Sequence, residues 1–138
     1  MIIPPISLVA TFEGAGFPQP VAETMAAIAM RESAGDPSAH NLNPATGDDS
    51  YGLVQINWAD ENVRSFLQGN GIADPNALLD PATTAKAAFL LWRGKNAYLD
   101  LLWYIRHVGT AYMAKYQANL LIVHEAVLAA VTLPSPVT

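Results

Sequence analysis

The chain has 138 residues, 51% of them apolar, which suits one domain with a hydrophobic core. Its formal charge is −5 at pH 7, with seven Lys and Arg against twelve Asp and Glu. This balance excludes the usual nucleic-acid binder, which presents a basic face. The sequence has no cysteine, which excludes disulfides and thiolate chemistry. We therefore expect a single domain over residues 1–138, stabilised by packing.

The first 19 residues are rich in Pro and Gly, so they predict an extended N-terminal arm. We expect no signal peptide there, because the start lacks a basic stretch and Pro4-Pro5 interrupts its apolar run. Residues 120–131 are the most apolar stretch, but they are too few to span a bilayer and include His124 and Glu125. A buried helix is the better prediction for them.

The rest of the chain predicts helices around one small β element. A helix is expected from Pro20 to Ser33, ended by Gly35 and Pro37. Residues 41–57 are rich in turn formers, and the β-prone run 51–56 predicts an irregular hairpin. Further helices are expected over 59–68, over 81–93 with Asp80 as N-cap and Gly94 as stop, and over 112–131. Residues 133–138 read as a C-terminal tail.

Glu32 is the residue whose position most suggests chemistry. Spacings of four, three and four residues place it on the same stripe of the predicted helix as Val21, Met25 and Ile28. Loss of hydration on an apolar face and the helix C-terminal dipole both disfavour a charged carboxylate, so we expect a raised pKa for Glu32. An acid that stays protonated near neutral pH can act as a general acid. The alternative is a solvent-exposed side chain in a last helical turn.

The residues around Glu32 carry a resemblance to a known family. They are Glu32-Ser33, then Gly35, Pro37, Ala39 and Asn41, then the segment Ser50-Tyr51-Gly52-Leu53-Val54-Gln55-Ile56-Asn57. In this order they resemble the lysozyme superfamily, and within it the branch of soluble lytic transglycosylases and goose-type lysozymes, in the small form found in phage proteins. The stretch from Leu79 to Gly94 resembles the next helix of that family. The resemblance covers about residues 15 to 116.

The resemblance implies a fold and a set of site residues. The implied fold is a lysozyme-like α+β domain, mainly α, whose β element forms one lip of a substrate cleft. Glu32 matches the catalytic acid, and Gln55 matches the glutamine of the cleft floor. Tyr112 is similar to the tyrosine of the family's Ala-Tyr motif, but Met113 replaces the usual Asn, and Tyr116 or Tyr104 are alternatives. The expected substrate-binding residues are Ser33, Asn41, Ser50, Tyr51, Gln55 and Tyr112.

The expected reaction depends on whether a second carboxylate takes part. Animal-type lysozymes carry an Asp before the Tyr-Gly pair, where this chain has Ser50. This departure favours a lytic transglycosylase, in which one Glu cleaves the MurNAc-GlcNAc β-1,4 bond and forms 1,6-anhydro-MurNAc ends. Asp48 and Asp49 keep open the alternative of a hydrolytic lysozyme, since either one could hold a water molecule across the cleft. Both are otherwise ordinary turn residues.

The expected partner is peptidoglycan, and no cofactor, nucleic acid or membrane span is expected. No metal site is expected either, since His40, His107 and His124 have no partner at metal-ligand spacing, although His40 could line the cleft. A non-catalytic virion or tail protein that grips glycan strands is the alternative from another class. Since no signal peptide is expected, we predict delivery to the cell wall by a phage particle or release at lysis.

Overall fold

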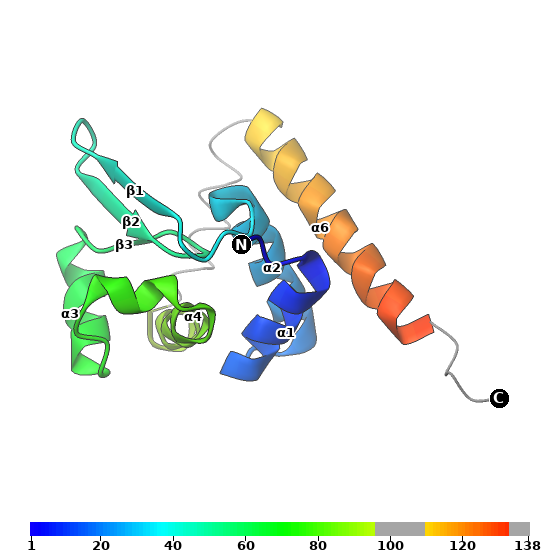
Figure 1. Cartoon of the computed structure of the whole chain (residues 1–138), viewed down its shortest axis with the longest axis horizontal. Helices are drawn as coiled ribbons and strands as arrows, with labels where there is room; N and C mark the ends of the chain where they lie inside the picture. Colours follow the sequence, from blue (N-terminus) through cyan, green and yellow to red (C-terminus); the bar gives the residue numbers. More distant parts are fainter. Residues whose placement is uncertain (96–109, 133–138) are drawn as a thin grey trace.

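A computed structural model describes residues 1–95 and 110–132 (Figure 1). Its helices and a small antiparallel sheet confirm the expected mainly helical α+β class. Figure 1 shows the sheet and α3 on one side of α2 and the long helix α6 on the other. The elements in chain order are α1 (Pro5–Ala15), α2 (Gln19–Ser33), β1 (His40–Asn43), β2 (Asp48–Tyr51), β3 (Ile56–Asn57), α3 (Glu61–Gly69), the 3-10 helix η1 (Pro75–Leu79), α4 (Pro81–Lys95) and α6 (Thr110–Thr132).

The extended arm predicted for residues 1–19 is wrong, because most of it forms α1. Pro5 occupies the first turn, where its missing N–H costs nothing, and three side chains that share a face, Leu8, Val9 and Phe12, are fully buried. Gly16 ends the helix in the left-handed conformation, with φ of 118°. The Pro and Gly residues therefore mark the two ends of a helix, and the apolar face of that helix packs in the core.

Helix α2 forms the centre of the core and confirms the helix predicted over residues 20–33. Met25 and Ile28 of the predicted apolar stripe are buried, and Val21 is partly buried. The helix packs against α1 on one side and α6 on another. It ends at Ala34, which has φ of 55° and donates its N–H to the Met30 carbonyl at 3.1 Å. Glu32 therefore lies in the last turn.

The strands form a sheet in the order β1-β2-β3, with each pair antiparallel. His40 pairs with Tyr51 and Asn43 with Asp48, so β1 and β2 form a hairpin. The β-prone run predicted over residues 51–56 is interrupted, because residues 52–55 form a turn. Gly52 and Gln55 both have positive φ there, 83° and 54°, which a strand does not allow.

Helices α3, α4 and α6 lie where the sequence predicts helices, with ends that differ by up to two residues, and the 3-10 helix η1 was not predicted. Asp60 caps α3, and Asp80 caps α4 by accepting the Thr83 N–H at 3.0 Å. Gly94 does not stop α4, which continues to Lys95. A Cβ built on Gly94 would lie 2.7 Å from the Phe66 ring, so this glycine lets α3 pack closely against α4.

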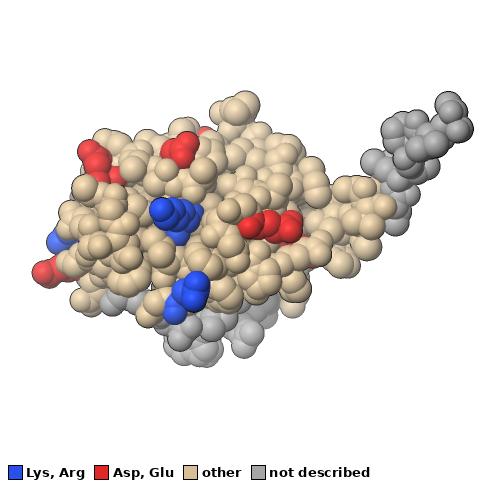
Figure 2. Space-filling model, turned by 90° about the horizontal axis from the view of Figure 1, so that it is seen from below, with Lys and Arg blue, Asp and Glu red and all other residues tan. Residues whose placement is uncertain are grey.

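Helix α6 extends the predicted helix over residues 112–131 by one or two residues at each end and packs on α2. Within residues 1–95 and 110–132, no helix combines the length and apolarity that a membrane span needs. The tail predicted for residues 133–138, together with His107 and Tyr104, lies outside the described residues. Figure 2 shows the Lys and Arg side chains of one face lying apart from one another.

Candidate active site

Glu32 stands where the buried face of α2 meets the surface. Ile28, one turn earlier, is fully buried, whereas the Glu32 side chain is partly buried. The next residue, Ser33, turns its hydroxyl back to the Ala29 carbonyl at 2.9 Å, which ties down the final turn. The helix C-terminus also disfavours negative charge at this position. Glu32 is thus partly shielded from solvent in the last turn of α2.

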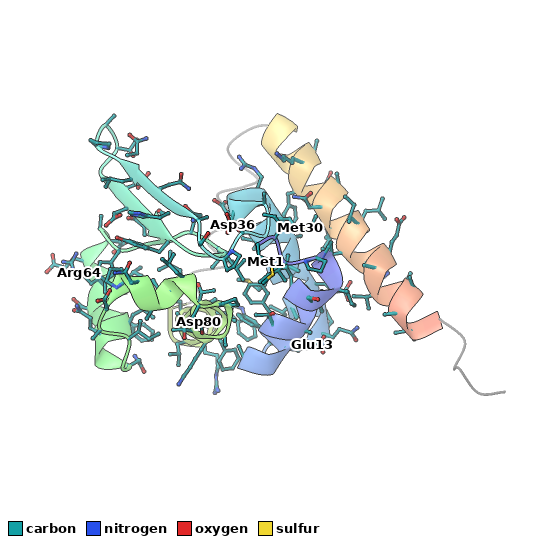
Figure 3. The ribbon with its side chains drawn as sticks, viewed as in Figure 1. Met1, Glu13, Met30, Asp36, Arg64 and Asp80 are labelled. Carbon is teal, nitrogen blue, oxygen red and sulfur yellow. The ribbon has the colours of Figure 1, made fainter. Side chains whose placement is uncertain are left out.

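The connection from α2 to the hairpin is fixed by close backbone contacts. The Ile3 N–H donates to the Gly35 carbonyl at 2.9 Å, and a Cβ on Gly35 would lie 2.9 Å from the Ile3 carbonyl oxygen. Asp36, which is labelled in Figure 3, follows this glycine. Its carboxylate accepts hydrogen bonds from the Ser38 hydroxyl at 2.7 Å and the Ser38 N–H at 2.9 Å. These bonds hold the pKa of Asp36 below its usual range. The chain therefore leaves the Glu32 turn along a defined path to β1.

Gln55 and Asn41 lie together at the base of the hairpin. The Asn41 side-chain amide donates to Gln55 Oε1 at 2.7 Å. Gln55 Nε2 donates to the carbonyls of Ala39, at 3.2 Å, and Gly52, at 2.9 Å. The Gln55 side chain thus ties the 52–55 turn to the start of β1. Any contact that it makes with a substrate comes from an amide already oriented by the protein.

Gly52 is the tightest backbone contact of the site. With φ of 83°, it lies against η1 so closely that an added Cβ would be 2.2 Å from the Leu78 carbonyl oxygen and 3.0 Å from Thr84 Oγ1. Its N–H donates to the Ala39 carbonyl at 2.8 Å. Only glycine combines this backbone conformation with this approach. The turn that carries Gln55 therefore packs against η1 and α4.

The two acidic residues of β2 are both bound within the sheet. Asp48 accepts hydrogen bonds from the Thr46 hydroxyl at 2.9 Å and the Asn57 side-chain amide at 3.1 Å. Asp49 lies 2.6 Å from His40 Nε2 and accepts the Tyr51 hydroxyl at 3.3 Å. Burial, then the nearby Asp49 carboxylate, raises the pKa of Tyr51. The carboxylates of Asp48 and Asp49 thus accept hydrogen bonds from neighbouring donors, as is usual for Asp residues in turns and strands.

His40 also stacks on Tyr51, with ring centroids 4.1 Å apart and planes 16° from parallel. The sequence indicates His40 as a cleft residue but does not indicate its partnership with Asp49, nine residues away. Only the β1–β2 register brings His40 opposite Tyr51 and next to the Asp49 carboxylate. The cluster of His40, Asp49 and Tyr51 could have been predicted only from the register of the hairpin.

The structure groups most of the predicted site residues on the sheet. Ser50 is partly buried and lies opposite Asn41 on β1 and Asn57 on β3. Glu32 and Ser33 stand at the other end of the 34–39 connection. Tyr112 lies in α6, but its side chain is outside the described residues. Tyr116, one alternative to it, is buried.

Two grooves lie elsewhere on the molecule. One of about 640 Å³ lies between α1 and α4, and one of about 560 Å³ lies between α2 and α6. Both grooves are lined by residues other than those of the candidate site. The size of a groove therefore does not locate the candidate active site. In the part of the chain that the structure covers, no group of three His, Asp or Glu side chains could hold a metal ion.

Fold and site together define a mainly helical domain with an acidic residue at the end of a central helix and a small sheet beside it. A family model described as a lysozyme-like domain matches residues 9–98, more than half of the chain. The chain therefore belongs to the lysozyme-like domain family. No curated protein matches it. Membership implies a glycosidase that acts on the peptidoglycan of bacterial cell walls, and the matched range contains Glu32 and the whole sheet.

Proposed function

We propose that this chain is a lytic transglycosylase that cleaves the MurNAc-GlcNAc β-1,4 bond with Glu32 as its single catalytic carboxyl group. The observation that carries the proposal is the state of the two other candidate carboxylates. Asp48 and Asp49 each meet two donors of the sheet or of its hairpin turn, at 2.6 to 3.3 Å. Each oxygen of both carboxylates thus already accepts a hydrogen bond from a protein donor, which supports a structural role for the two groups.

In the proposed reaction, protonated Glu32 gives its proton to the glycosidic oxygen, and the bond from that oxygen to C1 of MurNAc breaks. The GlcNAc unit leaves with a new hydroxyl group. Glu32, now ionised, takes the proton from the C6 hydroxyl of MurNAc as that oxygen bonds to C1. The product is a 1,6-anhydro sugar, no water is consumed, and Glu32 ends protonated as it began. The substrate's own N-acetyl group can stabilise the cationic centre, as in other substrate-assisted glycosidases.

The candidate substrate-binding residues have distinct proposed roles. Asn41 and Gln55 present one hydrogen-bonded amide pair, so they can offer polar contacts without reorganising. Ser50, opposite Asn41 in the hairpin, and Ser33, at the end of α2, are proposed to add further polar contacts. Tyr112, at the start of α6, is proposed as the tyrosine beside the acid.

The proposal is tested by digestion of purified peptidoglycan with the intact protein and four variants, followed by mass spectrometry of the sugar ends. Glu32→Gln should abolish product formation, whereas Asp48→Asn and Asp49→Asn should retain anhydro products. Glu61→Gln is the matched control, since Glu61 is an exposed residue in the first turn of α3. Reducing ends that disappear in Asp48→Asn or Asp49→Asn would instead establish the hydrolytic lysozyme.

One observation favours a second candidate function, a non-catalytic virion or tail protein that grips glycan strands. Helix α6 exposes apolar side chains that could dock a partner, namely Leu121, Ile122, Leu128 and Val131. Absence of products on several peptidoglycan types, together with retained glycan binding, would establish this candidate. The delivery route, by a phage particle or by release at lysis, stays a prediction from the sequence.

A further inference from the structure

One face of the β1–β2 hairpin gathers four side chains of complementary chemistry. Side chains alternate between the faces of a strand, and residues directly opposite each other share a face. His40 lies opposite Tyr51 and Leu42 opposite Asp49, so all four residues lie on the same face. Leu42 is 66% exposed, so its apolar surface lies open on this face. We call these four residues the hairpin platform.

The platform has a layered build. Tyr51 is partly buried and packs against the hydrophobic core, and the His40 ring lies on it. Because one face of the imidazole is covered by Tyr51, its 41% exposure indicates that the opposite face is open to solvent. Asp49 bonds both rings at their polar atoms and fixes their orientation. The result is a flat ring surface, rigidly held, next to an exposed aliphatic side chain.

The ring nitrogens of His40 have different roles. Asp49 as a carboxylate can only accept, so His40 Nε2 carries the hydrogen of their 2.6 Å contact. Nδ1 has no hydrogen-bond partner among the described residues. In the neutral imidazole the second nitrogen is an acceptor. With the imidazole in its neutral form, the platform presents a flat ring face with one hydrogen-bond acceptor at its edge.

We infer that the hairpin platform is a carbohydrate subsite, in which His40 stacks on the apolar face of one N-acetylhexosamine unit of a β-1,4-linked glycan. An N-acetylhexosamine has an apolar C–H face and donates hydrogen bonds through its hydroxyl groups and its amide N–H, so it complements both features of the platform. Leu42 adds apolar contact at the edge of the same sugar unit. Asp49 is a positioning residue here, since it acts through His40.

The platform lies next to the point where the Gln55 turn is attached to β1. The Ala39 carbonyl, one residue before His40, accepts hydrogen bonds from both the Gly52 N–H and the Gln55 side chain. The platform thus begins one residue after this attachment, on the face of the hairpin opposite the one that carries Asn41 and Ser50. This inference rests on the proposed function for the identity of the glycan, but it concerns binding and not the cleavage step.

The test measures binding of peptide-free glycan strands of alternating MurNAc and GlcNAc to full-length Glu32→Gln, which keeps the strands from being cut. His40→Ala in this background should weaken binding about threefold to tenfold, the range expected for loss of one aromatic contact. His40→Phe retains a ring over Tyr51 and should bind more tightly than His40→Ala. Asp49→Asn should weaken binding less than His40→Ala, because the stack remains.

The matched control is His124→Ala. His124 also contacts a carboxylate, Glu23, at 2.8 Å, and is also exposed, but it lies on α6. The His124→Ala variant should bind the glycan strands as tightly as the Glu32→Gln parent does. Unchanged binding in His40→Ala, or His40→Phe binding no better than His40→Ala, would overturn the inference. The inference would also be overturned if His40→Ala weakened the binding of free stem peptides but not the binding of glycan strands.

Failure of the two proposals can be told apart. If the protein with Glu32 intact yields anhydro ends while His40→Ala leaves both strand binding and KM unchanged, the subsite is wrong and the proposed function stands. If no cleavage is found but His40→Ala still weakens strand binding, the subsite stands and the proposed function is wrong.

Discussion

Replacement of Gly52 by alanine tests how the site is seated on the rest of the domain. Two costs are expected. A non-glycine residue held at φ of 83° costs about 1–2 kcal/mol. The new Cβ would lie 2.2 Å from the Leu78 carbonyl oxygen, so backbone must move, at a further cost of about 1–3 kcal/mol, as in other overpacked sites. Together these predict that Gly52→Ala lowers the free energy of unfolding by about 2–5 kcal/mol.

Gly47 provides the matched control, because its φ is 78° and a Cβ there would meet nothing within 4 Å. Gly47→Ala should therefore show only the backbone cost of about 1–2 kcal/mol. Urea unfolding followed by circular dichroism measures both variants, and a thermal scan should show a loss of about 3 °C per kcal/mol for a chain of this length. Equal losses of stability in the two variants would refute the close approach to Leu78.

The same change should affect activity beyond stability. The Gly52 carbonyl accepts the Gln55 side chain at 2.9 Å, so a shift of the turn also moves that amide. At a temperature where Gly52→Ala remains folded, we expect peptidoglycan cleavage to fall about tenfold or more, since small misplacements in an active site cost this much. Gly47→Ala should retain cleavage.

Three further predictions concern stability and titration. Asp60→Ala removes a cap that accepts the N–H groups of the two residues at the start of α3, at 3.0 and 3.2 Å, and should lower the unfolding free energy in urea by about 1 kcal/mol. Because the pKa of Tyr51 is raised, its contribution to stability is fully present below about pH 10 and is lost as pH rises through the folded pKa. Tyr51→Phe should remove one tyrosine ionisation from above the usual range in an absorbance titration and should flatten that loss of stability. The lowered pKa of Asp36 gives stability that is present above about pH 4 and lost as pH falls through the folded value; Asp36→Asn should lessen the acid sensitivity of the melting temperature, and an unchanged acid profile would contradict this role.

The sequence predicts the elements whose signals are local. The apolar stripe of α2 and the Asp80 cap of α4 are read from neighbouring residues, and both are confirmed. Helix α1 was missed because Pro5 and Gly16 count as breakers when composition is read without position. They stand at the two ends of the helix, where each residue type is favoured. The buried Phe12 face was the signal for a helix.

The parts of the site that escape prediction depend on contacts between distant residues. The turn at Gly52 and Gln55 falls inside a β-prone run, and the close approach of Gly52 to Leu78 joins residues that lie far apart in the sequence. The pairing of His40 with Asp49 needs the hairpin register, which the turn-rich residues between the strands do not specify. Sequence patterns can therefore locate the hairpin without giving its internal bonds.

The central claim is that Glu32 alone cleaves the glycan, without a water molecule. Digestion of peptidoglycan in water labelled with heavy oxygen tests this most directly, with mass spectrometry of the new sugar ends. We predict 1,6-anhydro ends that carry no label from the intact protein, and no new ends from Glu32→Gln. Labelled reducing ends, or cleavage that persists in Glu32→Gln, would contradict the claim.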